Sequence, residues 1–289
     1  MKTQMQQTLK ESFTLEGVGI HTGSKGKIVV HPAEEGTGRI FRSSGKAIPA
    51  MLDFVVDTTR CTTLGHEGVT ISTVEHLLSA LAGLNVDNAL IEVEGSEIPI
   101  LDGSALPFVE AIMSAGILEQ TQAARTIRIA SNFYKALGKT VVSAGKSDSL
   151  KITVATIFED WEAGRAIEVF TGETEHYKNA IAPARTFAFR QEVEALLAAG
   201  LAKGGSLDNA LIIDPSKSSY LNDDVVFLPG SFSSPLRVSQ EWAAHKLLDA
   251  IGDLALLNSR LAVDINIERP GHKWNVELAK EMRRIGKSD

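Results

Sequence analysis

Hydrophobic positions recur at helical spacing over residues 241–258, EWAAHKLLDAIGDLALLN. One face of the predicted helix is apolar and carries Leu247, Leu248, Ile251 and Leu254. A polar stripe lies beside it, because three ionisable residues follow one another at intervals of four: His245, Asp249 and Asp253. A solvated stripe is the simpler interpretation of this helix alone. The alternative interpretation is a helix that Ser239 caps and Asn258 ends, whose polar stripe faces a cleft.

A second helical pattern, STVEHLLSALAG, begins at Ser72. Ser72 and Glu75 have the spacing of a capping box, and Gly83 is placed to end the helix. His76 would lie in the first turn, where the positive end of the helix dipole favours the neutral imidazole that a metal ion requires. Capping alone would explain Glu75, and a lone histidine at such a position is more often not a ligand.

The two helical patterns resemble each other. EHLLSALAGL at residues 75–84 aligns without gaps on HKLLDAIGDL at residues 245–254, and a Val-Asp pair and a strand pattern follow each segment. This match predicts an internal duplication. If the two helices pack in related positions, His76 faces His245 across a pseudo-twofold axis and becomes a third ligand beside Asp249.

Outside these two helical segments, the hydrophobic pattern predicts strands, and the chain divides into two predicted domains. Short alternating runs with glycine turns over residues 9–60 indicate antiparallel strands, and a helix is expected from Pro107 to Ala115. Polar residues precede a new strand at Ile127, so we place the domains at 1–123 and 124–289. Further strands are expected near 127–134, 149–156 and 166–170. A strand-helix-strand unit near 187–213 is expected as an insert in the second domain. It could serve only for packing, or it could form the wall of an apolar groove.

Composition and charge narrow the classes of function. The net charge of -7 argues against nucleic acid as a partner, although a local basic patch could bind a phosphorylated small molecule. The single cysteine, Cys61, excludes an intrachain disulfide and fits a reducing compartment. No segment has the length and apolarity of a membrane span. We therefore expect a cytoplasmic protein without stable membrane insertion.

Two histidines and one carboxylate would leave the fourth position of a tetrahedral zinc ion (Zn2+) open, as in catalytic sites. Zinc polarises a carbonyl and lowers the pKa of bound water to roughly 7. The expected ligands are His76, His245 and Asp249. Glu75 is a candidate general base, and Asp253 could hydrogen-bond His272 and favour its cationic form as a general acid. Lys246 could stabilise an oxyanion.

Several motifs carry a family resemblance over nearly the whole chain. In chain order they are TTLG, TVEHLLSALAGLNVDNALIEVEGSEIPILDGSALPFV, APARTFAF, GGSLDNA, HKLLDAIGDLAL and GHKWN. Together they resemble the bacterial UDP-3-O-acyl-N-acetylglucosamine deacetylases. The resemblance implies an α+β fold of two similar two-layer β-α-α-β domains packed face to face, each with a small insert.

The resemblance also implies a function and roles for residues. The function is zinc-dependent removal of acetate from UDP-3-O-(3-hydroxyacyl)-N-acetylglucosamine in the committed step of lipid A synthesis. It implies zinc binding by His76, His245 and Asp249, and catalytic roles for Glu75, His272, Asp253, Lys246 and Thr186. The insert, residues 187–213, would enclose the fatty-acyl chain. We expect a monomer whose partner is this acylated UDP-amino sugar.

One departure from the family pattern lies beside the proposed acid, where Lys273 and Trp274 follow His272. This pair could alter substrate fit. Two alternatives to the deacetylase remain at this point. One is a zinc amidase acting on another N-acyl amino sugar, and the other is a non-catalytic lipid or nucleotide binder of the same fold.

Overall fold

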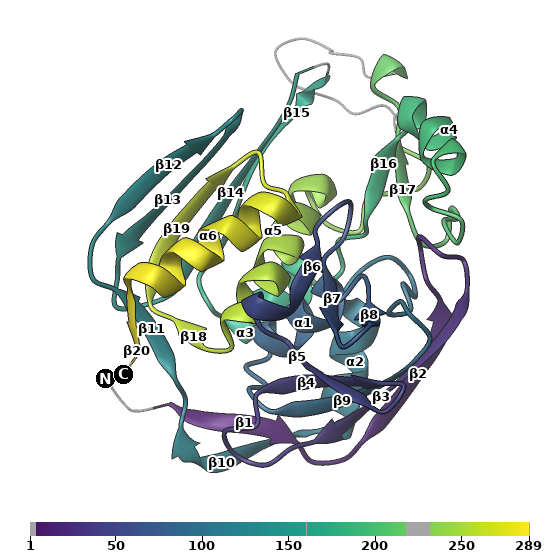
Figure 1. Cartoon of the computed structure of the whole chain (residues 1–289). Coiled ribbons are helices and arrows are strands. Elements are labelled where there is room, and N and C mark those ends of the chain that lie inside the picture. The colour runs from purple at the N-terminus through teal and green to yellow at the C-terminus, as the bar shows by residue number, and fades with distance from the viewer. Residues whose placement is uncertain (1–3, 160, 218–231, 289) are drawn as a thin grey trace.

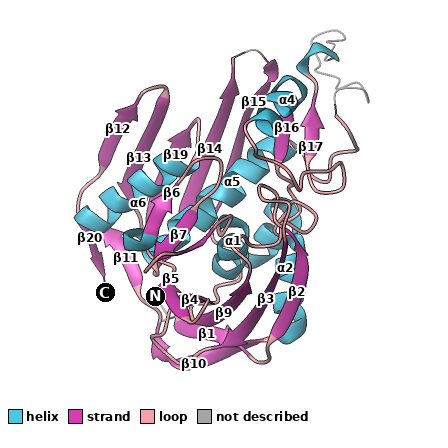
Figure 2. Ribbon diagram, turned by 45° about the vertical axis from the view of Figure 1, so that its right-hand side comes forward, coloured by secondary structure: helices cyan, strands magenta, loops and turns pink. Residues whose placement is uncertain are grey.

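The computed structural model describes residues 4–159, 161–217 and 232–288 of the chain (Figure 1). Two five-stranded sheets face each other across a layer of helices (Figures 1 and 2). Helix α1 (Glu75–Gly83) packs against helix α5 (Glu241–Leu254) in the middle of the molecule. The fold is therefore α+β, as predicted.

The first sheet has the strand order β2-β3-β9-β4-β5. Its central strand β9 alternates buried and more exposed side chains, because Ala89, Ile91 and Val93 face the helix layer. Strand β9 runs parallel to β4 and antiparallel to β3. The bounds of the strands are β2 (Phe13–Val18), β3 (Lys25–Pro32), β4 (Arg39–Ser43), β5 (Lys46–Pro49) and β9 (Ala89–Glu94).

The second sheet repeats this plan. Its order is β12-β13-β19-β14-β15, and β19 again runs parallel to one neighbour, β14, and antiparallel to the other, β13. This match in order and direction confirms the predicted duplication. The bounds are β12 (Phe133–Leu137), β13 (Thr140–Lys146), β14 (Lys151–Phe158), β15 (Trp161–Phe170) and β19 (Val263–Glu268).

Each half carries a second helix and an insert before its central helix. The second helices are α2 (Leu106–Ala115) and α6 (His272–Ile285). The first insert contains η1 (Leu52–Phe54), β6 (Val55–Asp57), β7 (Thr63–His66) and β8 (Val69–Ile71). The second contains α3 (Thr174–His176), η2 (Tyr177–Ile181), β16 (Phe187–Phe189), α4 (Arg190–Ala198), β17 (Leu211–Ile213) and η3 (Pro215–Lys217). The predicted strand-helix-strand unit is thus present as β16, α4 and β17.

Two small sheets join distant parts of the chain. Strand β1 (Met5–Leu9) pairs with β10 (Ile117–Ala123), and β11 (Thr126–Ile129) pairs with β18 (Arg260–Leu261) and β20 (Gly286–Ser288). The chain passes from the first group of strands to the second between β10 and β11. The domain boundary near residue 123 stays a prediction.

Three local predictions were wrong. The expected strand at 127–134 is two strands, β11 and β12, interrupted because Ala130 N donates to Ile285 O of α6. Helix α5 ends at Leu254, and a 3-10 turn, η4 (Ala255–Leu257), completes the segment up to Asn258. Ser239 does not cap α5, because the helix begins after Gln240, in the left-handed region, without a side-chain cap. In the described part of the chain no helix is long and apolar enough to cross a membrane.

The contact between α1 and α5 is close because Gly252 lies at it. A Cβ atom added to Gly252 would lie 2.1 Å from Glu75 O and 3.0 Å from Glu75 Cα. Backbone therefore meets backbone at this point, and any side chain on Gly252 would push the two helices apart. The close contact brings the first turn of α1 next to the C-terminal half of α5.

Candidate active site

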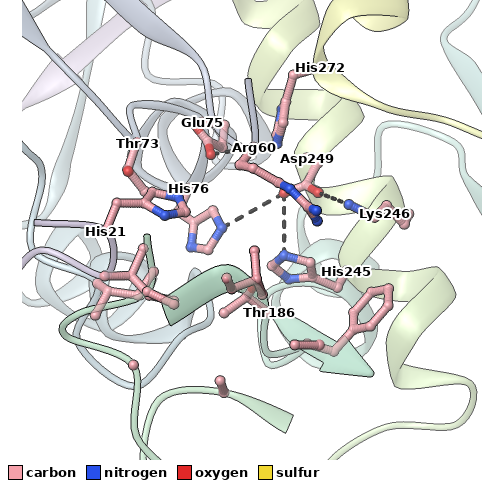
Figure 3. A pocket seen from close by; sticks show the side chains of 18 of the residues that line it. His21, Arg60, Thr73, Glu75, His76, Thr186, His245, Lys246, Asp249 and His272 are labelled. Carbon is pink, nitrogen blue, oxygen red and sulfur yellow. Dashed lines mark hydrogen bonds and ion pairs between the residues drawn. The ribbon is translucent and has the colours of Figure 1, made fainter. Parts of the chain in front are cut away.

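Helices α1 and α5 bring together the three predicted metal ligands (Figure 3). His76 comes from the first turn of α1, whereas His245 and Asp249 lie one turn apart on α5. Asp249 Oδ1 lies 3.7 Å from His76 Nε2 and 3.4 Å from His245 Nε2. Two ligand atoms at about 2.0–2.1 Å from a tetrahedral zinc ion lie about 3.3 Å apart, so the spacing suits such an ion.

The bonding of these side chains also fits a metal ion. All three are buried, and Asp249 Oδ1 has no hydrogen-bond partner within the described part of the chain. An ionised oxygen buried in this way is costly unless it binds a cation. His245 Nδ1 donates to Ala184 O at 3.0 Å, which leaves the lone pair of Nε2 directed toward Asp249.

The electrostatics of the ligands favour the protonation states that metal binding needs. Burial, together with the neighbouring His245, lowers the pKa of His76 to about 3. Burial also lowers the pKa of His245. Burial alone would raise the pKa of Asp249, but His245 and Lys246 outweigh it and lower this pKa. The site therefore holds two neutral imidazoles and one carboxylate.

Glu75 lies beside the ligands and does not form the predicted capping box. Helix α1 begins after Val74 without a side-chain cap, and Glu75 Oε2 accepts a hydrogen bond from Thr62 N at 3.0 Å. Burial raises the pKa of Glu75 to about 7, with Asp253 and Asp249 adding to the rise and His272 opposing it. A carboxylate with such a pKa can accept a proton near neutral pH.

His272 and Asp253 form the predicted pair. His272 is the first residue of α6, and its Nδ1 donates to Asp253 Oδ2 at 2.9 Å. Asn275 Nδ2 also donates to Oδ2, and Thr62 Oγ1 donates to Oδ1 at 2.6 Å. Burial alone would lower the pKa of His272, but Asp253 and Glu75 outweigh it and raise this pKa to about 10. The Nε2 atom of His272 lies 3.7 Å from Glu75 Oε1.

Lys246 and Thr186 also line the site (Figure 3). Lys246 Nζ lies 2.9 Å from Asp249 Oδ2 and 5.6 Å from the centre of the Phe187 ring. Thr186 N donates to Gly103 O at 2.7 Å. The residue before it, Arg185, is buried and donates its Nε to Glu241 Oε1 at 2.8 Å. These contacts fix the segment that carries Thr186 to both halves of the molecule.

A cavity of about 610 Å³ opens onto these residues. Its apolar wall comes largely from the second insert, with Phe187, Val193, Leu196, Leu197, Leu207 and Ile212. Helix α4 has no buried residue, since its apolar side faces this cavity rather than a core.

The sequence did not assign two residues that the structure places at the site. Thr62 binds both Glu75 and Asp253; it is the first residue of the TTLG motif, which carries the family resemblance but gave this residue no role. His21 lines the cavity because Glu97 holds its loop by accepting hydrogen bonds from the backbone of His21 and Thr22. The run VGIHTG marks this loop in the sequence, but Glu97, which accepts its hydrogen bonds, lies 76 residues from His21.

Sequence comparison finds similar proteins over nearly the whole chain. The sequence profile of the UDP-3-O-acyl N-acetylglycosamine deacetylase family matches residues 6–284. A UDP-3-O-acyl-N-acetylglucosamine deacetylase of Thermodesulfovibrio yellowstonii is 37% identical, over 97% of this chain and 92% of its own length. Proteins with the same name are 41% identical in Saccharophagus degradans and 42% in Legionella pneumophila, each over 96% of this chain and over 90% and 89% of their own lengths.

Proposed function

The chain belongs to the UDP-3-O-acyl N-acetylglycosamine deacetylase family, and on this premise we propose a substrate, a metal and a mechanism for it. The proposed reaction is zinc-dependent hydrolysis of the N-acetyl group of UDP-3-O-(3-hydroxyacyl)-N-acetylglucosamine. It yields acetate and the free 2-amine and is the committed step of lipid A biosynthesis. The observation that carries the proposal is the meeting of His76 with His245 and Asp249 beside Glu75 and His272.

The three buried ligands His76, His245 and Asp249 would hold the zinc ion. When bound, such an ion polarises a carbonyl group and makes water more acidic. The hydrogen bond from His245 Nδ1 to Ala184 O fixes the orientation of that imidazole. Lys246 balances the charge of Asp249 through the 2.9 Å contact with Oδ2.

Glu75 acts as the general base that takes the proton of the attacking water. Thr62 N holds one of its carboxylate oxygens, which leaves the other, Oε1, on the side of His272 and the cavity. A pKa near 7 allows Glu75 to accept this proton at neutral pH and to release it afterwards.

His272 protonates the amine as the bond between carbon and nitrogen breaks. Asp253 accepts from Nδ1, so the proton for transfer is on Nε2, the atom that faces Glu75. The raised pKa keeps His272 cationic at neutral pH until the amine takes the proton. Lys246 and Thr186 stabilise the negative oxygen of the tetrahedral intermediate.

The apolar wall of the second insert receives the acyl chain of the substrate. Phe187, Leu196 and Leu197 line the cavity along the length of this wall. Burial of acyl carbons against these side chains contributes about 0.8 kcal/mol per methylene group. The enzyme therefore distinguishes the acylated sugar from its unacylated precursor.

Acetate release tests the proposal. The purified protein is expected to release acetate from the acylated UDP-N-acetylglucosamine, to stop after zinc chelation, and to recover when zinc is returned. Glu75→Ala is the matched control, because it removes the base and leaves the three ligands. Equal efficiency on unacylated UDP-N-acetylglucosamine would contradict the proposed substrate, and undiminished turnover in a zinc-free protein would contradict the metal.

A further inference from the structure

A second cavity, of about 700 Å³, lies between the two halves of the molecule. It is beside the small sheet that contains β11 and β18 (Figure 1). Within the described part of the chain it shares no lining residue with the catalytic cavity at the metal ligands. Ser149 and Thr171 are exposed residues of its lining, so it is open to solvent on that side. Its volume is within the range of small-molecule sites, about 300–1,000 Å³.

The lining of this second cavity carries more cations than carboxylates. Three arginines line it, Arg39, Arg128 and Arg260, against two carboxylates, Asp87 and Asp148. Arg260 engages both oxygens of Asp87, since its Nε donates to Oδ1 at 3.1 Å and its Nη2 donates to Oδ2 at 2.8 Å. Asp148 is exposed, so water screens its charge. The inner part of the cavity therefore keeps an excess of positive charge.

Arg39 is a buried cation without a carboxylate partner. It is 7% exposed, and it forms no ion pair with any carboxylate that the structure describes. Its Nε donates to Val86 O at 3.0 Å, and its Nη1 donates to Ala255 O at 3.3 Å. Burial lowers the pKa of Arg39 to about 10, against the opposing effect of Asp87, so Arg39 is cationic at neutral pH. A buried charge that only neutral carbonyl groups contact is costly.

Helix capping explains the two hydrogen bonds of Arg39 but not its remaining donors. Val86 lies just beyond α1 and Ala255 just beyond α5, so Arg39 binds carbonyl groups at the negative ends of both central helices. A guanidinium has five N–H groups, and those on Nη2 have no partner among the residues that the structure describes. Because Arg39 lines the second cavity, a ligand there can accept hydrogen bonds from them.

Another part of the lining is apolar. It comes mostly from α5 and from strands β14 and β15 of the second sheet. Its apolar side chains are Leu150, Ile152, Phe170, Ile251, Leu254 and Leu261. A bare inorganic ion would leave this surface uncovered, whereas an anion with an apolar body would cover it and reach the arginines as well.

We propose that the second cavity binds a small organic phosphate, with its phosphate group on Arg39 and its apolar body against Phe170 and Leu254. Three arginines in one lining favour a dianion, because each guanidinium can donate charge-assisted hydrogen bonds to phosphate oxygens. The proposal does not depend on the reaction proposed above. Helices α1 and α5 each line both cavities, so this ligand would contact the same two helices that carry the metal ligands.

Calorimetric titration of the zinc-loaded protein with phenyl phosphate, in a phosphate-free buffer, tests the proposal. We expect a Kd of about 1 mM or lower, and much weaker binding of phenol and of inorganic phosphate, each of which lacks one part of the interaction. Arg39→Gln should raise the Kd for phenyl phosphate about tenfold or more, because it removes a charge-assisted contact. Arg42→Gln, at an exposed arginine of the same strand β4, is the matched control and should bind as the wild type does.

A second variant keeps the test independent of the helix contacts that Arg39 makes. Ala124→Trp leaves Arg39 unchanged and places an indole ring in the second cavity, so it should also abolish binding of phenyl phosphate. Thermal unfolding verifies that each variant is folded. The proposal is wrong if the wild type does not bind phenyl phosphate, or if a folded Arg39→Gln or Ala124→Trp variant binds it as the wild type does.

Two further outcomes would also overturn the proposal. An equal loss of binding in Arg42→Gln would show a general effect of surface charge. A loss in Lys273→Gln, at a cation that lines the catalytic cavity, with binding retained in Arg39→Gln and Ala124→Trp, would place the phosphate in the catalytic cavity instead.

Discussion

Substitution of Gly252 by alanine tests the link between helix packing and metal binding. The new Cβ atom would lie 2.1 Å from Glu75 O, whereas unstrained contacts of this kind are about 3.3 Å. Helices α1 and α5 must therefore separate by roughly 1 Å near this point. The displaced segment of α1 carries Glu75 and His76, so the third metal ligand moves with it.

The size of this movement decides whether zinc affinity or folding stability is lowered more. Zinc sites tolerate deviations of about 0.2 Å in ligand distance, so a shift of about 1 Å is far outside the range of the site. We expect Gly252→Ala to lower zinc affinity at least about tenfold to a hundredfold and to lower turnover even at saturating zinc. Overpacking costs about 1–3 kcal/mol of folding stability, and the better helix propensity of alanine offsets about 1 kcal/mol of it.

Zinc competition with a chromophoric chelator measures the affinity, and chemical denaturation of the zinc-free protein measures the stability. The matched control is Gly83→Ala, also at the end of a central helix. Its Cβ atom would lie 2.4 Å from the Tyr177 ring, away from the metal ligands. We expect Gly83→Ala to lose stability and to keep zinc affinity. Wild-type zinc affinity and turnover in Gly252→Ala would refute the reasoning.

Three further predictions concern single groups of the site and its support. Glu75→Gln is expected to keep zinc, measured by metal analysis, and to lose at least about a hundredfold in kcat, because the base is removed. Asp253→Asn removes the negative charge that raises the pKa of His272, so His272 loses its proton at lower pH. The alkaline limb of the pH–rate profile should therefore move to lower pH. An unmoved limb would count against His272 as the acid. Glu241→Ala leaves Arg185 buried without its carboxylate partner and should cost about 3–5 kcal/mol in denaturant unfolding; a loss below about 1 kcal/mol would show that solvent reaches this pair.

Much of the fold could be predicted because it is encoded in local periodicity. The leucine spacing around His245 identified α5, and the match with residues 75–84 identified both the duplication and the contact of α1 with α5. The i, i+4 spacing placed His245 and Asp249 together, and the duplication added His76. These predictions succeeded because each used a short-range pattern whose three-dimensional consequence is fixed by helix geometry.

The remaining features depend on contacts between distant residues, which no local pattern records. Glu75 has the spacing of a capping residue, yet its carboxylate binds Thr62, a residue of the first insert. Alternation in β9 predicts a buried face but not that β4 will be its parallel neighbour. The ion pair of Arg185 with Glu241 joins residues 56 positions apart, so its partners cannot be paired from the sequence. The boundary near residue 123 and the catalytic roles stay predictions.

The repeated sheet order has an evolutionary consequence. If one ancestral half once paired with an identical copy, both central helices would have carried the same side chains, and any centre on their common axis would have been symmetric. In the alignment of the two helices, Asp249 corresponds to Ser79 and His76 to Lys246. The ligand set therefore requires the two copies to have diverged, because two identical halves could not supply this unequal set of side chains.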